Sequence, residues 1–153
     1  MSDIETERQI RYWLLDMDGV LIHEEDPIPG APEFINRLKE LEIPFLVLTN
    51  SSIYSRRDLS ARLHRSGLEV PEKSIWTSAL ATATFLRDQR PNGSAFVVGE
   101  PGLATAMHEA GYTINESDPD YVVLGETRTY SFERITQAIR LILKGARFIA
   151  TNP

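Results

Sequence analysis

Short hydrophobic runs alternate along the chain with longer segments in which hydrophobic residues recur every three or four positions. An apolar run at 12–15 precedes such a segment at 31–41, and a run at 43–50 precedes another that begins after Ser55. Short apolar runs bounded by turn residues are typical of strands, whereas spacing by three or four is typical of amphipathic helices. The alternation predicts an α/β fold with a mostly parallel sheet.

The same alternation continues to the end of the chain. A weaker strand is predicted near 74–77 and a helix over 79–89. Gly67 and Gly111 suit the ends of helices, Ser55 suits an N-cap, and Pro101 suits a first helical turn. The remaining predictions are strands within 94–100, 121–126 and 147–153, and helices within 101–111 and 131–144.

Two aspartates end the first apolar run. Asp16 and Asp18 flank Met17 and are followed at once by Gly19. Because successive side chains of a strand point to opposite faces, both carboxylates are expected on one side, where the backbone leaves the sheet. A divalent cation would offset their repulsion, and Mg²⁺ favours a few carboxylate oxygens together with water and phosphate. The pair therefore points toward phosphoryl chemistry.

Polar residues also follow the next predicted strand, at Thr49 and Asn50. In parallel sheets ligands gather where strands end and helices begin, so consecutive strand ends are expected to share one crevice. A carboxylate such as Asp16 can attack phosphorus, and Asp18 can act as general acid and base. Gly19 allows close approach of the backbone, and the Thr-Asn segment before a helix offers an anion site. The alternative is that these residues only form solvated turns and a helix entry.

Other polar residues carry weaker signals. The histidines show no metal-ligand spacing and are expected in surface or loop positions: His23, His64 and His108. Four arginines of one predicted helix could attract a substrate but are interpreted as a solvated face: Arg56, Arg57, Arg62 and Arg65.

Composition narrows the class of protein. The 153 residues are 25% charged and 42% hydrophobic, as in globular proteins, and no apolar run approaches the ~18 residues of a membrane helix. No membrane partner is therefore expected. The polar N-terminus and the absence of cysteine favour a cytoplasmic protein without a secretory signal. A net charge of −6 argues against a nucleic-acid partner.

The motif D-M-D-G-V at 16–20, with L-T-N at 48–50, resembles the first two motifs of the haloacid dehalogenase (HAD) superfamily of phosphatases. Later segments, in order, resemble its NagD-like subfamily IIA: T-S-A-L-A-T-A-T-F-L, V-V-G-E, P-D-Y-V-V-L-G-E-T-R-T-Y and G-A-R-F-I-A-T-N-P. The resemblance runs from about Tyr12 to Pro153 and implies a Rossmann-like core with a cap of the α/β C2 type.

The resemblance assigns roles to the strand-end residues. It implies that Asp16 is the nucleophile and a Mg²⁺ ligand, and that Asp18 is the acid/base and a second metal ligand through its backbone carbonyl. It also implies that Asp18, Gly19, Thr49 and Asn50 bind the phosphate. The expected activity is Mg²⁺-dependent hydrolysis of small phosphorylated metabolites, either nucleoside monophosphates or sugar phosphates, through an aspartyl-phosphate intermediate.

The resemblance also divides the chain into two domains: residues 1–79 are expected to form the N-terminal part of the core, and residues 80–153 part of the cap. The family has a lysine and an acidic pair C-terminal to this cap. No candidate occupies a matching position among Lys39, Lys73, Lys144, Asp118 and Asp120. The chain is therefore expected to be the N-terminal portion of a longer enzyme, truncated before the C-terminal half of the core and poorly active alone.

An incomplete sheet is expected to expose edges and apolar faces, so a homo-oligomer is possible. Two other functions stay open. One is a non-catalytic phosphate-binding or interaction module. The other is a receiver-like signalling domain phosphorylated on an aspartate, which fits less well because such a domain needs its acceptor aspartate on a strand after the acidic pair.

Overall fold

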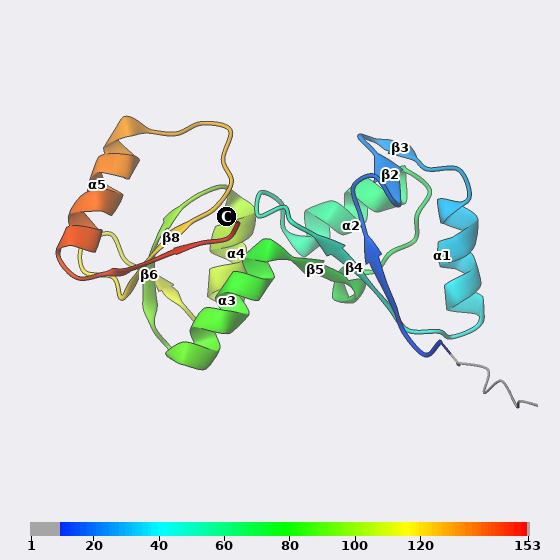
Figure 1. Cartoon of the computed structure of the whole chain (residues 1–153), viewed down its shortest axis with the longest axis horizontal. Helices are drawn as coiled ribbons and strands as arrows, with labels where there is room; N and C mark the ends of the chain where they lie inside the picture. The colour runs from blue at the N-terminus through cyan, green and yellow to red at the C-terminus, as the bar shows by residue number, and fades with distance from the viewer. Residues whose placement is uncertain (1–9, 153) are drawn as a thin grey trace, which may run out of the picture.

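The computed structural model describes residues 10–152, which form two parallel sheets with their own helices (Figure 1). In the first sheet the strand order is β1-β4-β5, and a short antiparallel hairpin, β2-β3, follows β1. The elements of this unit are β1 (Trp13–Asp16), β2 (Ile22–His23), β3 (Asp26–Pro27), α1 (Ala31–Glu40), β4 (Phe45–Thr49), α2 (Arg56–Arg65), the 3-10 turn η1 (Glu72–Ser74) and β5 (Ile75–Thr77).

Helices α1 and α2 pack against the same hydrophobic cluster as one face of the first sheet. Leu15, Val47 and Ile75 are buried there, one from each strand, together with Ile35 of α1 and Leu63 of α2. Burying these side chains removes apolar surface from water, which contributes roughly 25 cal/mol per Å². The alternation of strand side chains thus supplies one continuous core to this unit.

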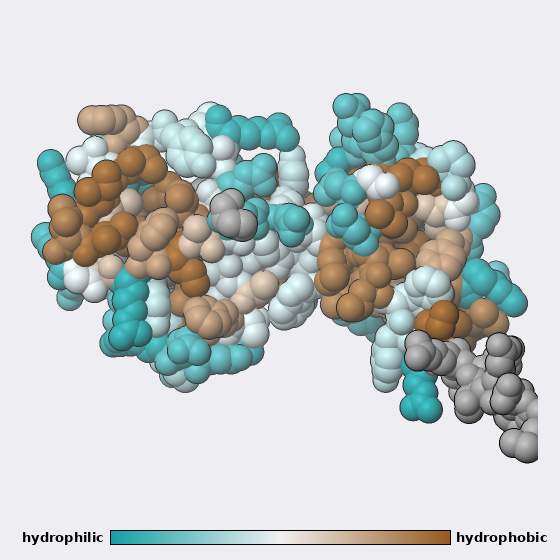
Figure 2. Space-filling model, viewed as in Figure 1, coloured by the Kyte–Doolittle hydropathy of each residue, from teal (hydrophilic) through white to brown (hydrophobic). Residues whose placement is uncertain are grey.

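The opposite face of the first sheet is open. Leu14 on β1 is 68% exposed and Trp76 on β5 is 38% exposed, although both are large and apolar. Figure 2 shows hydrophobic residues gathered over this region of the molecule, where β1, β4 and β5 lie in Figure 1. The expectation of an uncovered apolar face is confirmed.

The second sheet has the order β7-β6-β8-β9, with all pairs parallel. Helices α3 and α4 share a cluster with one face, where Val97 and Val123 are buried, and α5 covers the other face over Phe96 and Val122. The elements are α3 (Ser78–Gln89), β6 (Ser94–Val98), α4 (Pro101–Glu109), β7 (Thr113–Ile114), β8 (Tyr121–Leu124), α5 (Phe132–Leu143) and β9 (Arg147–Ala150).

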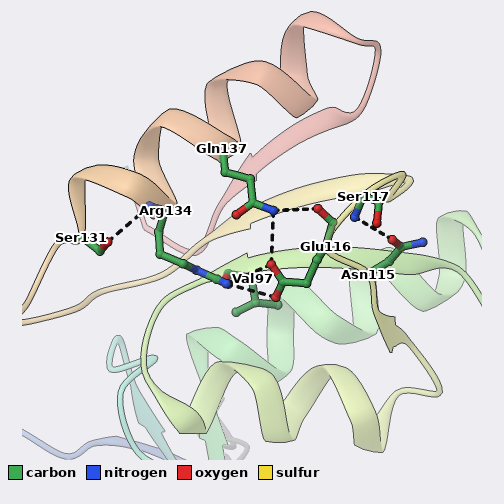
Figure 3. A network of polar contacts seen from close by, with 7 residues as sticks. All are labelled: Val97, Asn115, Glu116, Ser117, Ser131, Arg134 and Gln137. Atoms are coloured by element: carbon green, nitrogen blue, oxygen red, sulfur yellow. Dashed lines mark hydrogen bonds and ion pairs between the residues drawn. The ribbon is translucent and has the colours of Figure 1, made fainter.

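A polar network fixes the N-terminal half of α5 (Figure 3). Arg134 donates to both carboxylate oxygens of Glu116 at 3.0 Å and to the carbonyl of Val97 at 2.6 Å. Its guanidinium also lies over the ring of Phe96, 4.3 Å from the centroid. Gln137 donates to the Glu116 carbonyl at 2.7 Å. The network ties α5 to the segment after β7 and to β6.

The predicted helix boundaries are confirmed. Ser55 caps α2, its hydroxyl accepting from the Asp58 N–H while the Asp58 carboxylate accepts from the Ser55 N–H. Pro101 occupies the first turn of α4, and Gly67 and Gly111 follow α2 and α4 with φ of +78° and +85°. Left-handed φ is easily adopted by glycine, which explains both positions.

Three details differ from or complete the predictions. The last strand, predicted within 147–153, is β9 and ends at Ala150, and Pro153 lies outside the described residues. All three histidines are exposed, as predicted: His23, His64 and His108. Within residues 10–152, no helix is long and apolar enough to cross a membrane.

Candidate functional site

The acidic pair and the Thr-Asn segment lie at the same edge of the first sheet. Strands β1 and β4 are adjacent and parallel, with Asp16 opposite Leu48 in the register. Their carboxyl ends therefore lie next to each other, followed by Asp18 on one side and Thr49 on the other. The prediction that these two strand ends share one edge is confirmed.

Asp16 and Asp18 are both exposed, whereas Met17 between them is 1% exposed. One oxygen of the Asp16 carboxylate accepts the N–H of Met17 at 2.9 Å. The hydroxyl of Thr49 donates to the Asp18 carboxylate at 3.4 Å. The expected alternation is present: the apolar residue is buried in the core and the two carboxylates face outward beside Thr49.

Gly19 begins the turn that leads into the hairpin. Its φ is +81°, and a Cβ there would meet no atom within 4 Å. Its N–H donates to the Ile22 carbonyl at 2.8 Å. The resemblance implies that Gly19 is part of the phosphate site, and in this conformation its amide serves the turn. What Gly19 contributes in this conformation is a left-handed turn and open space beside Asp18.

Asn50 lies where three segments meet. Its backbone carbonyl accepts hydrogen bonds from the Ser78 hydroxyl at 2.7 Å and from the Asn152 side-chain amide at 2.9 Å. The Thr49 hydroxyl, in turn, accepts the N–H of Ser51 at 3.2 Å. Hydrogen bonds from Ser78 and Asn152 thus hold the backbone of the Thr-Asn segment, while Asn50 itself is exposed.

The loop after β4 also contacts the second unit directly. The fully buried Ser52 accepts the N–H of Glu126 at 2.8 Å, and the N–H of Gly102 donates to the Ile53 carbonyl at 3.0 Å. Sequence reasoning did not identify this junction. A serine in a polar loop gives no sequence signal of a partner 74 residues away.

The donor set fits a magnesium ion of the kind that keeps several waters. Mg²⁺ is usually bound by one or two carboxylates together with waters and substrate phosphate. The exposed Asp16 carboxylate supplies one such ligand, and Asp18 is expected to add its backbone carbonyl. Within residues 10–152, no group of three or more acidic or histidine side chains is placed to hold a metal. A magnesium ion held by Asp16 and Asp18 would therefore have no third acidic or histidine ligand among these residues.

Comparison with known proteins identifies relatives over most of the chain. Residues 13–113 match the family of haloacid dehalogenase-like hydrolases. The chain is 60% identical over 141 residues to dihydroxyacetone phosphatase of Corynebacterium glutamicum strain R, covering 92% of this chain and 51% of that protein. It is 42% identical over 144 residues to ribonucleotide monophosphatase NagD of Escherichia coli K12, covering 94% of this chain and 57% of that protein.

Solved structures agree with the sequence relatives. The structure of NagD from E. coli K-12 matches with a TM-score of 0.87 at 41% identity, over 95% of this chain and 58% of that one. The chain thus spans about half the length of the relatives it matches.

Proposed function

The chain belongs to the haloacid dehalogenase-like hydrolases, with NagD-like proteins among its relatives, and from this premise we propose that it carries the nucleophile of a phosphatase. The proposed substrates are small phosphorylated metabolites, either sugar phosphates or nucleoside monophosphates. The names of two relatives, a dihydroxyacetone phosphatase and a ribonucleotide monophosphatase, support this range. The reaction is hydrolysis of a phosphate monoester.

In the proposed reaction, an Asp16 carboxylate oxygen attacks phosphorus and the bond from phosphorus to the ester oxygen breaks. Asp18 gives its proton to the leaving oxygen and then takes a proton from the water that attacks the aspartyl phosphate. That second step releases inorganic phosphate and restores the Asp16 carboxylate. Asp16 and the Asp18 backbone carbonyl would hold Mg²⁺, which when bound neutralises charge on the phosphoryl oxygens.

The observation that carries this proposal is the placement of Thr49 beside the acidic pair. The Oγ1–Oδ2 distance of 3.4 Å brings together two residues 31 positions apart. The Thr49 hydroxyl orients Asp18 and, with Asn50 and Gly19, forms the proposed phosphate site. Since Met17 holds one oxygen of Asp16, the other oxygen remains for attack on phosphorus.

We further propose that 1–79 belongs to the catalytic core and 80–153 to a cap that encloses the leaving group. The separate hydrophobic clusters support a division close to this boundary, because one spans Leu15 to Ile75 and the next begins at Ala79. Turnover by the 153-residue chain is expected to be low, since no lysine matches the position of the family lysine. A cytoplasmic location completes the proposal.

The proposal is tested by binding of beryllofluoride, which mimics a phosphoryl group on aspartate. Fluorine NMR should show Mg²⁺-dependent binding to the wild-type chain and none to Asp16→Asn. An exposed aspartate of the second unit provides the matched control, so Asp118→Asn should bind like wild type. Equal binding by Asp16→Asn would contradict the assignment of the nucleophile. Formation of a long-lived phosphoaspartate from acetyl phosphate would favour the receiver-like alternative.

A further inference from the structure

Three arginines from two parts of the fold line one cavity away from the acidic pair. The cavity has a volume of about 440 Å³ and lies between α2, the hairpin turn after β2 and the loop after β8. Its polar lining consists of Arg62, Arg65, Arg128, Tyr54, Asp58 and Glu25. The cavity thus carries three guanidinium groups and two carboxylates, in a chain whose net charge is −6.

The positive charges of this cavity are incompletely balanced. Asp58 is engaged in the cap of α2, where it accepts the Ser55 hydroxyl at 2.6 Å. Glu25 supplies the other carboxylate. Across the part of the chain that the structure describes, neither Arg65 nor Arg128 takes part in an ion pair. Two exposed guanidinium groups therefore remain available to an anion.

Arg62 has a donor without an acceptor. Its terminal nitrogen donates to the Glu24 carbonyl, but its Nε is buried and has no hydrogen-bond partner among residues 10–152. A buried polar group that lacks a partner costs free energy, so such groups are rare in folded proteins. This unpaired donor belongs to a residue that lines the cavity.

The backbone of Arg128 is held by a residue of the neighbouring strand end. The Glu100 carboxylate accepts the hydroxyl of Thr127 at 2.7 Å and the N–H of Arg128 at 3.4 Å. The carboxylate thus contacts the Thr127 side chain and the Arg128 main chain, and the Arg128 guanidinium forms no ion pair among the described residues. Arg128 lines the same cavity as Arg62 and Arg65, which lie three positions apart in α2.

We propose that this cavity binds a phosphate-type oxyanion, separate from the phosphate that reacts at Asp16. Guanidinium groups match the geometry of phosphate oxygens, with two parallel N–H donors for each pair. The anion would link α2 of the first unit to the loop after β8 of the second. Its source is either inorganic phosphate or the phosphoryl group of a monoester. This inference does not depend on the reaction proposed above.

The test is a titration of the 153-residue chain with inorganic phosphate, followed by ¹H–¹⁵N NMR at constant ionic strength. Saturable shifts are expected at the amides of Tyr54, Ala61, Arg65 and Arg128. Removing two of the three guanidinium groups in the variant R65Q/R128Q should weaken this binding by about 10-fold or more. Both side chains are exposed, so the variant should keep the dispersed spectrum of the folded chain.

The control R87Q removes an exposed arginine of α3 and should leave the phosphate affinity unchanged. A parallel titration with methyl phosphate compares the two sources: equal or tighter binding shows that the site accepts a monoester, whereas much weaker binding restricts it to inorganic phosphate. The proposal is overturned if shifts occur only at 16–19 and 49–50. It is also overturned if R65Q/R128Q binds phosphate like wild type, or if chloride produces the same shifts.

Discussion

Replacing Gly102 by alanine tests the junction between the two units. Gly102 lies in the first turn of α4, and a Cβ built there would lie 2.5 Å from the carbonyl carbon of Tyr54 and 2.6 Å from the oxygen of Ile53. Both atoms are backbone, so no side chain can turn away. The helix and the loop would have to separate by about 0.9 Å to reach 3.4 Å, an ordinary van der Waals distance.

The sign of the effect distinguishes this close contact from ordinary helix propensity. Alanine in place of glycine within a helix alone would stabilise the chain by about 1 kcal/mol. Overpacking against a fixed backbone typically costs about 1–3 kcal/mol, and the hydrogen bond from Gly102 to Ile53 would lengthen as well. We therefore expect Gly102→Ala to lower the free energy of unfolding, measured by urea denaturation, and to shift the NMR amide signals of 51–54.

Gly67→Ala is the control for the glycine-to-alanine change itself. A Cβ added at Gly67 would meet no atom within 4 Å, and the φ of this residue is +78°. The cost of the change there is therefore conformational, and the signals of 51–54 should stay unchanged. If Gly102→Ala unfolds at the same or a higher urea concentration than wild type, with an unchanged loop spectrum, the reasoning about this junction is wrong.

Three further changes have defined outcomes. Ser55→Ala removes the cap of α2 and should cost about 1 kcal/mol in urea denaturation, whereas unchanged stability would contradict the capping role. Burial raises the pKa of Tyr112, so the stability it contributes is present below pH 10 and falls as pH rises through its folded pKa. In Tyr112→Phe that alkaline decline should be smaller. Stability at neutral pH should drop by about 1–3 kcal/mol, because the carbonyls of Leu86 and Arg90 lose their hydroxyl donor. Identical pH profiles of the variant and the wild type would refute this. Leu14→Lys places a charge on the open face of the first sheet and should reduce self-association measured by light scattering. A wild-type chain that is monomeric at all concentrations would rule out the homo-oligomer.

Local patterns predicted most of the secondary structure because they depend on neighbouring residues. The cap at Ser55 and the helix stop at Gly67 follow from backbone chemistry within one turn. The placement of Asp16 and Asp18 likewise follows from strand alternation around a buried Met17. Parallel pairing of β1 with β4 could also be anticipated, since both strands precede helices in one α/β alternation.

The junction around the Thr-Asn segment could not be predicted in the same way. Asn152 reaches the Asn50 carbonyl across 102 residues, and Ser78 reaches it across 28. Single polar residues in loops carry no periodic signal, and their partners are decided by how the two sheets pack together. The hydrogen bond from the Gly19 amide to the Ile22 carbonyl was likewise not predicted from the sequence.

The most direct test of the central claim is chemical trapping of the proposed aspartyl phosphate. The chain would be incubated with 4-nitrophenyl phosphate and Mg²⁺, reduced with borohydride, digested and mapped by mass spectrometry. Borohydride reduces an acyl phosphate to an alcohol, so we predict conversion of Asp16 to homoserine only when substrate and Mg²⁺ are both present. Release of phosphate with Asp16 unmodified, or with the label on another carboxylate, would contradict the account.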